Sequence, residues 1–402
     1  MKKLFMSLFS TALRIATALG MIAIYANALS LEQFTHLAVG LLCAQITCIF
    51  VDGGVNNEIL RSARLESIAQ NAKRLYESIA ARLAVSTAIS ICLVMYNLLT
   101  TTWDNTVISL AAFFSGVLSS INETNLVNLK ATNRFKDELI NSTAQSALII
   151  SISCFVLISP GLAALSILFP RLFTTGVLLR GIGKNNMRKI RNRMSIKSVF
   201  GYYTRLKHYT LDSVFSNLGA QLDAILISVL IGKEAFAIYQ PTSRVLSSSL
   251  NLGGVIGALV IPRATTLHSD KNIKHYLLGS FFVFGLVVAA LFFVFCNYFL
   301  SILFGSIFSP SLDIEIILTF MIIVRFLAAG AGSYLTIKGQ QKKRAIINAI
   351  CAVSAVVFTV MYGYFYHINI EVILRILLAL QVVMMIFYVL SVVKYVESVF
   401  ID

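Results

Sequence analysis

Residues 276–300 read YLLGSFFVFGLVVAALFFVFCNYFL, and this stretch contains no charged side chain. A helix that crosses the hydrocarbon core of a bilayer needs about 20 consecutive, mainly apolar residues. The stretch is long enough for this and ends near polar residues on both sides. It therefore predicts a membrane-spanning helix.

Segments of the same kind recur along the whole chain. Of its 402 residues, 57% are hydrophobic and 13% are charged, compared with roughly 45–50% and about 25% in soluble domains. We therefore predict an all-α integral membrane protein of about twelve spanning helices with short connections. The predicted spans are residues 4–29, 34–59, 79–99, 107–126, 139–158, 162–179, 211–231, 239–261, 276–300, 314–335, 345–366 and 372–395.

The net charge of +15 raises the question of a nucleic-acid partner. With twelve spans, most lysines and arginines fall in loops on one side of the membrane. The opposite side has Lys233 as its one basic residue, together with Glu32, Asp104, Glu234, Asp313 and Glu371. Since basic loops stay in the cytoplasm, both termini are predicted to be cytoplasmic. The basic charge then reflects membrane topology, and we expect no nucleic-acid partner.

The longest predicted cytoplasmic loop lies at the middle of the chain and is strongly basic. We interpret residues 181–210 as a linker between an N-terminal lobe, residues 1–180, and a C-terminal lobe, residues 211–402, each with six helices. An even number of helices gives both lobes the same orientation, as in a parallel repeat. In such an arrangement we expect the substrate to bind between the lobes.

Arginines inside the predicted spans are the strongest functional signal. Each costs about 2.5–3.5 kcal/mol at the bilayer centre on insertion scales, so most must face protein or water. Arg82 and Arg375 lie near predicted helix ends, where a long side chain reaches the interface. Four others lie deeper and are predicted either to bind substrate in a cavity or to form structural ion pairs: Arg14, Arg171, Arg244 and Arg325.

Polar or small residues also follow one face of two neighbouring predicted helices, at spacings of four, three and four. We expect these stripes to line one side of a wet cleft. They are Asp212, Ser216, Gly219 and Asp223 on one helix, and Gln240, Arg244, Ser247 and Asn251 on the next.

Acidic residues within spans are candidates for proton or cation coupling. Asp223 is the first choice and is predicted to pair with Arg244, because the two lie at similar depths below the same membrane surface. Glu123 and Asp52 are further candidates. Both lie near the cytoplasmic ends of their spans, so hydrogen bonding at a helix end, or pairing of Asp52 with Arg61, is equally compatible with their positions.

Signals for catalysis or a bound metal are weak. The chain has no Walker A, HExxH, CxxC or GxSxG motif, and its six cysteines show no metal-ligand spacing. We therefore expect no catalytic residue, no metal site and no cofactor. The protein is predicted not to be an enzyme.

Five stretches, taken in order with the topology, resemble the polysaccharide transporter, or O-antigen flippase, branch of the multidrug, oligosaccharidyl-lipid and polysaccharide exporter superfamily. They are residues 51–54 (VDGG) with Arg61, residues 126–136 (LVNLKATNRFK), residues 217–244 with Asp223, Gly232, Tyr239 and Arg244, residues 303–311, and residues 337–342 (IKGQQK).

This resemblance implies two six-helix bundles around a cationic cavity that opens alternately to either face of a bacterial cell inner membrane. The expected cargo is an undecaprenyl-pyrophosphate-linked oligosaccharide, whose pyrophosphate suits arginine. Tyr25 and Tyr239 are candidates for stacking on sugars, or else belong to an interfacial aromatic belt. The expected partners are the bilayer, a proton or sodium gradient, and a polysaccharide polymerase with its assembly proteins.

Other functions remain open from the sequence. A lipid II flippase or drug exporter would have the same architecture with a different cargo, although a drug exporter would favour an anionic cavity. A membrane polysaccharide polymerase or ligase would also handle lipid-linked sugars, but the predicted non-cytoplasmic loops are short. A non-transporting scaffold would leave the arginines within the spans unexplained.

Overall fold

The computed structural model describes residues 2–52, 86–95, 102–132, 134–181, 207–264 and 269–399, with the single residues 79, 201, 204 and 267. The described residues are helical or lie in turns and short connections, and none of them is in a strand. The chain divides into two compact units, Met1–Val214 and Phe215–Asp402.

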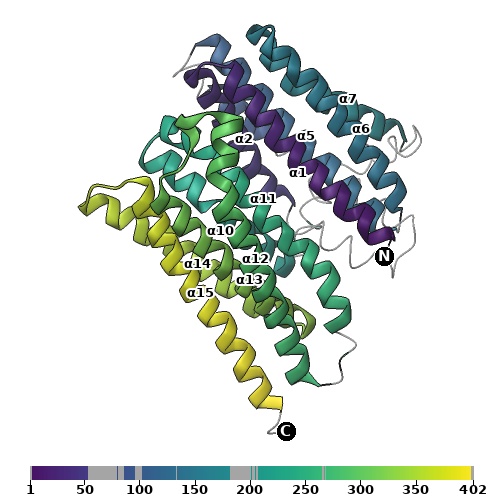
Figure 1. The fold of residues 1–402 in the computed structure, drawn as a ribbon, viewed down its shortest axis with the longest axis vertical. Helices are drawn as coiled ribbons and strands as arrows, with labels where there is room; N and C mark the ends of the chain where they lie inside the picture. Colours follow the sequence, from purple (N-terminus) through teal and green to yellow (C-terminus); the bar gives the residue numbers. More distant parts are fainter. Residues whose placement is uncertain are drawn as a thin grey trace. The chain divides into compact units, whose positions relative to one another are not determined.

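The N-terminal unit contains five long helices among its described residues. These are α1 (Lys2–Ala28), α2 (Leu31–Asp52), α5 (Trp103–Ala131), α6 (Phe135–Ser153) and α7 (Ala163–Gly181). Two short 3-10 turns, Cys154–Leu157 and Pro160–Leu162, join α6 to α7. Helix α2 packs against α5, α1 packs against α6, and α5 also contacts α7, as can be followed in Figure 1.

The C-terminal unit is formed by the last six helices. They are α10 (Lys207–Leu230), which begins before the boundary, α11 (Lys233–Ala264), α12 (Asp270–Phe304), α13 (Leu312–Ile337), α14 (Gln341–Phe365) and α15 (Ile370–Val399). A 3-10 turn, Ser306–Phe308, follows α12. Helix α13 is central, since it packs against α11, α12, α14 and α15.

The predicted membrane character is confirmed. Ten of the described helices are long and apolar enough to cross a membrane, and α11 is 32 residues long but carries a polar stripe. Eleven of the twelve predicted spans coincide with these helices. The span predicted at residues 79–99 lies mostly outside the described residues, apart from a short helix at Ser86–Met95. Arg82 and most of the predicted linker, residues 181–210, also lie outside them.

Helices α2 and α5 approach each other closely through small residues. A Cβ atom added to Gly116 would lie 2.5 Å from the Cβ of Ala44, and one added to Gly40 would overlap the carbonyl oxygen of Ser109. Apolar side chains gain little by leaving lipid for a protein interior, so membrane helices associate through close packing of this kind. Glycine is therefore required at both positions for the observed separation of the two helices.

We expect Gly40→Ala to destabilise the N-terminal unit by about 1–3 kcal/mol, the usual cost of overpacking a tight contact. The measurement is the midpoint of thermal unfolding in detergent. Gly176→Ala on α7 is the matched control, because an added Cβ there meets nothing within 4 Å. Equal midpoints for the two variants would contradict the close packing of α2 and α5.

Candidate functional site

Arg14 and Glu123 meet within the N-terminal unit. Arg14 on α1 lies 3.9 Å from the Glu123 carboxylate on α5 and donates a hydrogen bond of 3.4 Å to the Thr11 hydroxyl. The buried Nε of Arg14 has no hydrogen-bond partner among the described residues. Two candidates that the sequence analysis treated separately therefore form one ion pair, which leaves part of the guanidinium available.

A second ion pair lies in the same unit and involves a fully buried acid. Glu138 on α6 has an exposed fraction of 0%, accepts a hydrogen bond of 3.0 Å from the Ser10 hydroxyl, and lies 3.3 Å from the Lys130 ammonium. Lys130 also interacts electrostatically with the Arg14 and Glu123 side chains. We call Ser10, Arg14, Glu123, Lys130 and Glu138 the charge cluster; it joins α1, α5 and α6.

Arg171 lies on α7 directly after Pro170, within reach of the electrostatic field of Glu123. Its buried Nε has no hydrogen-bond partner in the part of the chain that the structure describes. The neighbouring Tyr25 is fully buried, and its hydroxyl lies 2.9 Å from the Ser166 hydroxyl and 3.3 Å from that of Ser153. Tyr25 therefore connects α1, α6 and α7 and offers no exposed ring face to a sugar.

In the C-terminal unit, Asp223 is surrounded by hydrogen-bond donors and an arginine. It is 1% exposed, and its Oδ2 accepts a hydrogen bond of 2.8 Å from the Tyr239 hydroxyl and one of 3.5 Å from Ser243. Its charge attracts Arg325, which donates a 3.3 Å bond from Nη2 to the carbonyl oxygen of Gly219, one helical turn away on α10. Oδ1 of Asp223 and Nη1 of Arg325 are buried without a hydrogen-bond partner among the residues described.

A cavity of about 300 Å³ lies beside Arg325 and is formed by α10, α11, α13, α14 and α15. We call it the arginine cavity because Arg325 and Arg344 both line it. Amide side chains from four helices add hydrogen-bonding groups to its wall: Asn217, Asn251, Asn348 and Gln381. Gln381 is 9% exposed, and its Oε1 lacks a hydrogen-bond partner in the described structure. Two guanidinium groups and several amides suit an anionic ligand with many acceptor oxygens.

The predicted residues are distributed unevenly around these features. Ser216, Gly219 and Asn251 of the two polar stripes line the arginine cavity. Arg244 is half-buried on α11 and lies outside this lining. The neighbours given above for Asp223 are Tyr239, Ser243 and Arg325. Arg325 was not expected beside this carboxylate, and the pairing of Asp223 with Arg244 stays a prediction. Asp52 is the last residue of α2, and its expected partner Arg61 lies outside the described residues.

Several site residues were missed by the sequence analysis, among them Arg344, Glu138 and Gln381. Arg344 lies between the predicted spans 314–335 and 345–366, but in the structure it is in the first turn of α14, which begins at Gln341. It donates a 3.0 Å hydrogen bond to the Thr336 hydroxyl and lines the arginine cavity. Glu138 was placed just before a predicted span and not considered. Gln381 was read as part of an apolar helix. The available signal for Glu138 and Gln381 was a polar residue on a helix face that is otherwise apolar or small.

Comparison with solved structures identifies the class of fold. An inward-facing multidrug resistance MATE family transporter of the MOP superfamily is 13% identical, with 96% of this chain and 95% of that chain covered and a TM-score of 0.66. The lipid II flippase MurJ in an inward closed conformation is 13% identical, with 96% and 86% covered and a TM-score of 0.65. A MOP superfamily transporter from Pyrococcus furiosus is 12% identical, with 96% of each chain covered and a TM-score of 0.62. The chain is thus a multi-pass membrane protein with the MOP superfamily fold.

The family follows from the sequence itself. Residues 1–268 match the family model described as polysaccharide biosynthesis protein, and the chain belongs to this family. No curated protein sequence matches the chain. The resemblance drawn from the motifs is therefore confirmed.

Proposed function

We propose that the protein is a flippase that moves an undecaprenyl-pyrophosphate-linked oligosaccharide across the bacterial inner membrane by alternating access. The cargo would be an O-antigen or related surface polysaccharide repeat unit. The observation that carries this proposal is Arg325, whose buried Nη1 has no hydrogen-bond partner among the described residues, beside a cavity that also contains Arg344. A buried charged donor with unused capacity is costly unless a ligand satisfies it.

The charge of the site favours a phosphate-bearing cargo. Arginine presents several donors in a rigid fork and remains charged in a low-dielectric site, which suits a pyrophosphate. Arg14 and Arg171 supply further guanidinium groups in the N-terminal unit, each with a buried Nε that lacks a partner in the described residues. A cationic drug would be repelled by these groups, so the drug-exporter alternative is disfavoured.

Asp223 is the candidate for coupling to an ion gradient. Its carboxylate lies in the field of Arg325, and one of its oxygens is buried without a hydrogen-bond partner among the described side chains. When an anionic cargo binds Arg325, the positive charge of Arg325 attracts both the cargo and the Asp223 carboxylate. The carboxylate is then stabilised less by Arg325 than before. In our proposal the carboxylate then takes up a proton or a sodium ion, which links cargo binding to the gradient.

The test is transport by the purified protein in lipid vesicles with a fluorescent undecaprenyl-pyrophosphate-linked oligosaccharide. Lipid II and a cationic dye are the comparison cargoes. We expect translocation of the oligosaccharide carrier and none of the dye. Faster transport of lipid II would favour the lipid II flippase alternative, and dye export alone would overturn the proposal. In cells, deletion of the gene should cause lipid-linked repeat units to accumulate on the cytoplasmic face.

A further inference from the structure

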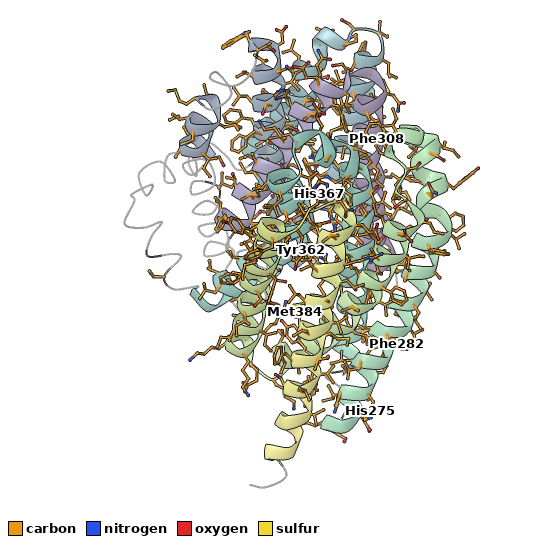
Figure 2. The ribbon with its side chains drawn as sticks, turned by 90° about the vertical axis from the view of Figure 1, so that its left-hand side faces the viewer. His275, Phe282, Phe308, Tyr362, His367 and Met384 are labelled. Carbon is orange, nitrogen blue, oxygen red and sulfur yellow. The ribbon has the colours of Figure 1, made fainter. Side chains whose placement is uncertain are left out.

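A second cavity of about 630 Å³ lies in the C-terminal unit, where α10 ends, α13 begins and a short turn joins α14 to α15. We call it the aromatic cavity; its polar and aromatic lining consists of Tyr366, His367, Asn369 and Glu371. Figure 2 shows Tyr362 and His367 toward one end of the unit and His275 at the other. The basic start of α14, residues 342–344, and the turn after Phe365 lie at opposite ends of this helix, which runs from Gln341 to Phe365.

Exposed aromatic rings are concentrated at this turn. Residues 361–367 read MYGYFYH, and the rings of Tyr362 and Tyr366 lie 5.0 Å apart with an interplanar angle of 33°. Tyr366 is 64% exposed. By contrast, the tyrosines that the sequence analysis considered for sugar stacking, Tyr25 and Tyr239, are buried and hydrogen-bonded.

The polar groups of the aromatic cavity are held in place by the start of α15. The Asn369 side-chain oxygen accepts a hydrogen bond of 2.9 Å from the Val372 backbone N–H. This bond at the start of α15 fixes the orientation of the Asn369 side-chain amide. Glu371 forms an ion pair with Arg375 one turn later, which compensates its charge. Imidazole, amide and carboxylate groups next to an aromatic ring form a lining with both donors and acceptors.

We infer that the aromatic cavity binds the saccharide part of the lipid-linked cargo, an inference that rests on the proposed function. A sugar ring has an apolar face that packs on an aromatic ring, and hydroxyl groups that both donate and accept hydrogen bonds. Ligand sites combine these features, with apolar and aromatic walls and a few polar groups that set orientation. The described residues that line the aromatic cavity include no lysine or arginine, whereas Arg325 and Arg344 line the arginine cavity, which therefore suits the anionic pyrophosphate better.

The spacing of the two cavities agrees with a cargo that has two chemically different parts. Ile314 lines the aromatic cavity and Arg325 lines the arginine cavity on the same helix, α13. At 1.5 Å per residue, eleven residues separate them by about 16 Å along the helix axis. A saccharide of several residues can extend over such a distance from its pyrophosphate.

The same turn also contains aromatic residues of a different kind. Tyr364 is 84% exposed and Phe365 is 68% exposed, and neither lines the aromatic cavity. These two side chains fit an interfacial aromatic belt, which anchors a helix end at the membrane surface. Tyr364 is therefore a matched control for Tyr366. If the aromatic cavity binds saccharide, Tyr366→Ala weakens saccharide binding and Tyr364→Ala does not.

The binding test uses the purified chain in lipid nanodiscs and the free saccharide released by mild acid from the lipid-linked intermediates of the source cells. Saturation-transfer NMR measures the dissociation constant without any pyrophosphate or transport step. We expect Tyr366→Ala to weaken binding about tenfold, the factor that corresponds to 1.4 kcal/mol. Tyr366→Phe keeps the ring and should bind like the unsubstituted protein, as should Tyr364→Ala.

Equal binding by Tyr366→Ala and the unsubstituted protein would overturn the inference, and so would equal weakening by Tyr364→Ala and Tyr366→Ala. Transport in vesicles separates this result from the proposed function. If the unsubstituted protein transports the lipid-linked cargo but Tyr366→Ala binds saccharide normally, the inference alone fails. If saccharide binding depends on Tyr366 but the unsubstituted protein transports nothing, the proposed function fails and the saccharide site stands.

Discussion

Arg325→Ala is expected to lower transport of the pyrophosphate-linked cargo by about 100-fold or more. Hydrogen bonds to a charged group contribute about 1.5–3 kcal/mol each, and a guanidinium that engages a pyrophosphate through two of them loses about 3 kcal/mol or more on truncation. Each 1.4 kcal/mol is a factor of ten. The measurement is the initial rate of translocation in vesicles at a fixed cargo concentration.

Arg325→Lys extends this prediction, because lysine keeps the positive charge and loses the planar fork. We expect transport to remain well below that of the unsubstituted protein. Lys343→Ala is the control for loss of a nearby charge, since Lys343 is exposed at the start of α14, next to Arg344, and does not line the arginine cavity. Normal transport by Arg325→Ala would refute a role of Arg325 in cargo binding.

Asp223→Asn distinguishes cargo binding by Arg325 from a structural role. Removal of Arg325 leaves the Asp223 carboxylate with the Tyr239 and Ser243 hydroxyl groups but without its opposing charge. The readout is cargo binding to the protein in detergent, because Asp223 is also the proposed coupling residue and its loss alone would lower transport. If this uncompensated charge were the cause of the loss, adding Asp223→Asn to Arg325→Ala would restore cargo binding. If Arg325 binds the cargo, the double variant still fails to bind it.

The fold was predictable because hydropathy depends on each segment alone. A segment must be apolar over its whole length to cross the bilayer, whatever it packs against. The predicted span 345–366 thus coincides with α14, Gln341–Phe365, and the helix begins earlier because it continues into the basic residues beyond the hydrocarbon core. The number of helices then follows from counting the apolar segments, which are separated by short loops that are basic on one side of the membrane.

The pairing of charges was not predictable in the same way. Depth along a helix follows from counting residues, and by this measure Asp223 and Arg244 are matched, a pairing that stays a prediction. Contact also requires that two side chains face each other, and the rotation and packing of each helix come from tertiary structure. In the structure α13 places Arg325 next to Asp223 and Gly219, although it lies about a hundred residues away in sequence.

Glu138 illustrates a second reason. In the sequence it adjoins Arg134, Lys136 and Asp137, so it has the appearance of a solvated loop charge. Because α6 begins at Phe135, Glu138 lies in the first turn of this helix, on the side that packs against α1. Its neighbour Asp137 is 43% exposed and pairs with Arg134, whereas Glu138 is fully buried.

Removal of Lys130 is expected to destabilise the N-terminal unit strongly. Lys130→Met would leave the buried Glu138 carboxylate with only the Ser10 hydroxyl among its described partners. Breaking a buried ion pair by removing one partner costs about 3–5 kcal/mol, because a buried charge remains uncompensated. We expect a loss of about 3 kcal/mol, measured from denaturant unfolding in detergent micelles, since Lys130 itself is 24% exposed.

The two partners should differ in their cost. Glu138→Gln leaves a lysine that reaches water, so we expect it to destabilise less than Lys130→Met. The double variant Glu138→Gln/Lys130→Met has no buried charge left at this position and should recover most of the stability, because replacing both partners of a buried pair is often nearly neutral.

Arg134→Ala provides the matched control on the same helix. It breaks the ion pair with Asp137, in which the nitrogen–oxygen distance is 2.7 Å and the side chains are 63% and 43% exposed. Exposed pairs contribute about 0–1 kcal/mol, so this variant should unfold almost like the unsubstituted protein. If Lys130→Met cost no more than Arg134→Ala, or if the double variant were as unstable as Lys130→Met, Glu138 would not carry an uncompensated charge. The charge cluster would then be held together by the packing of α1, α5 and α6 and not by its ion pairs.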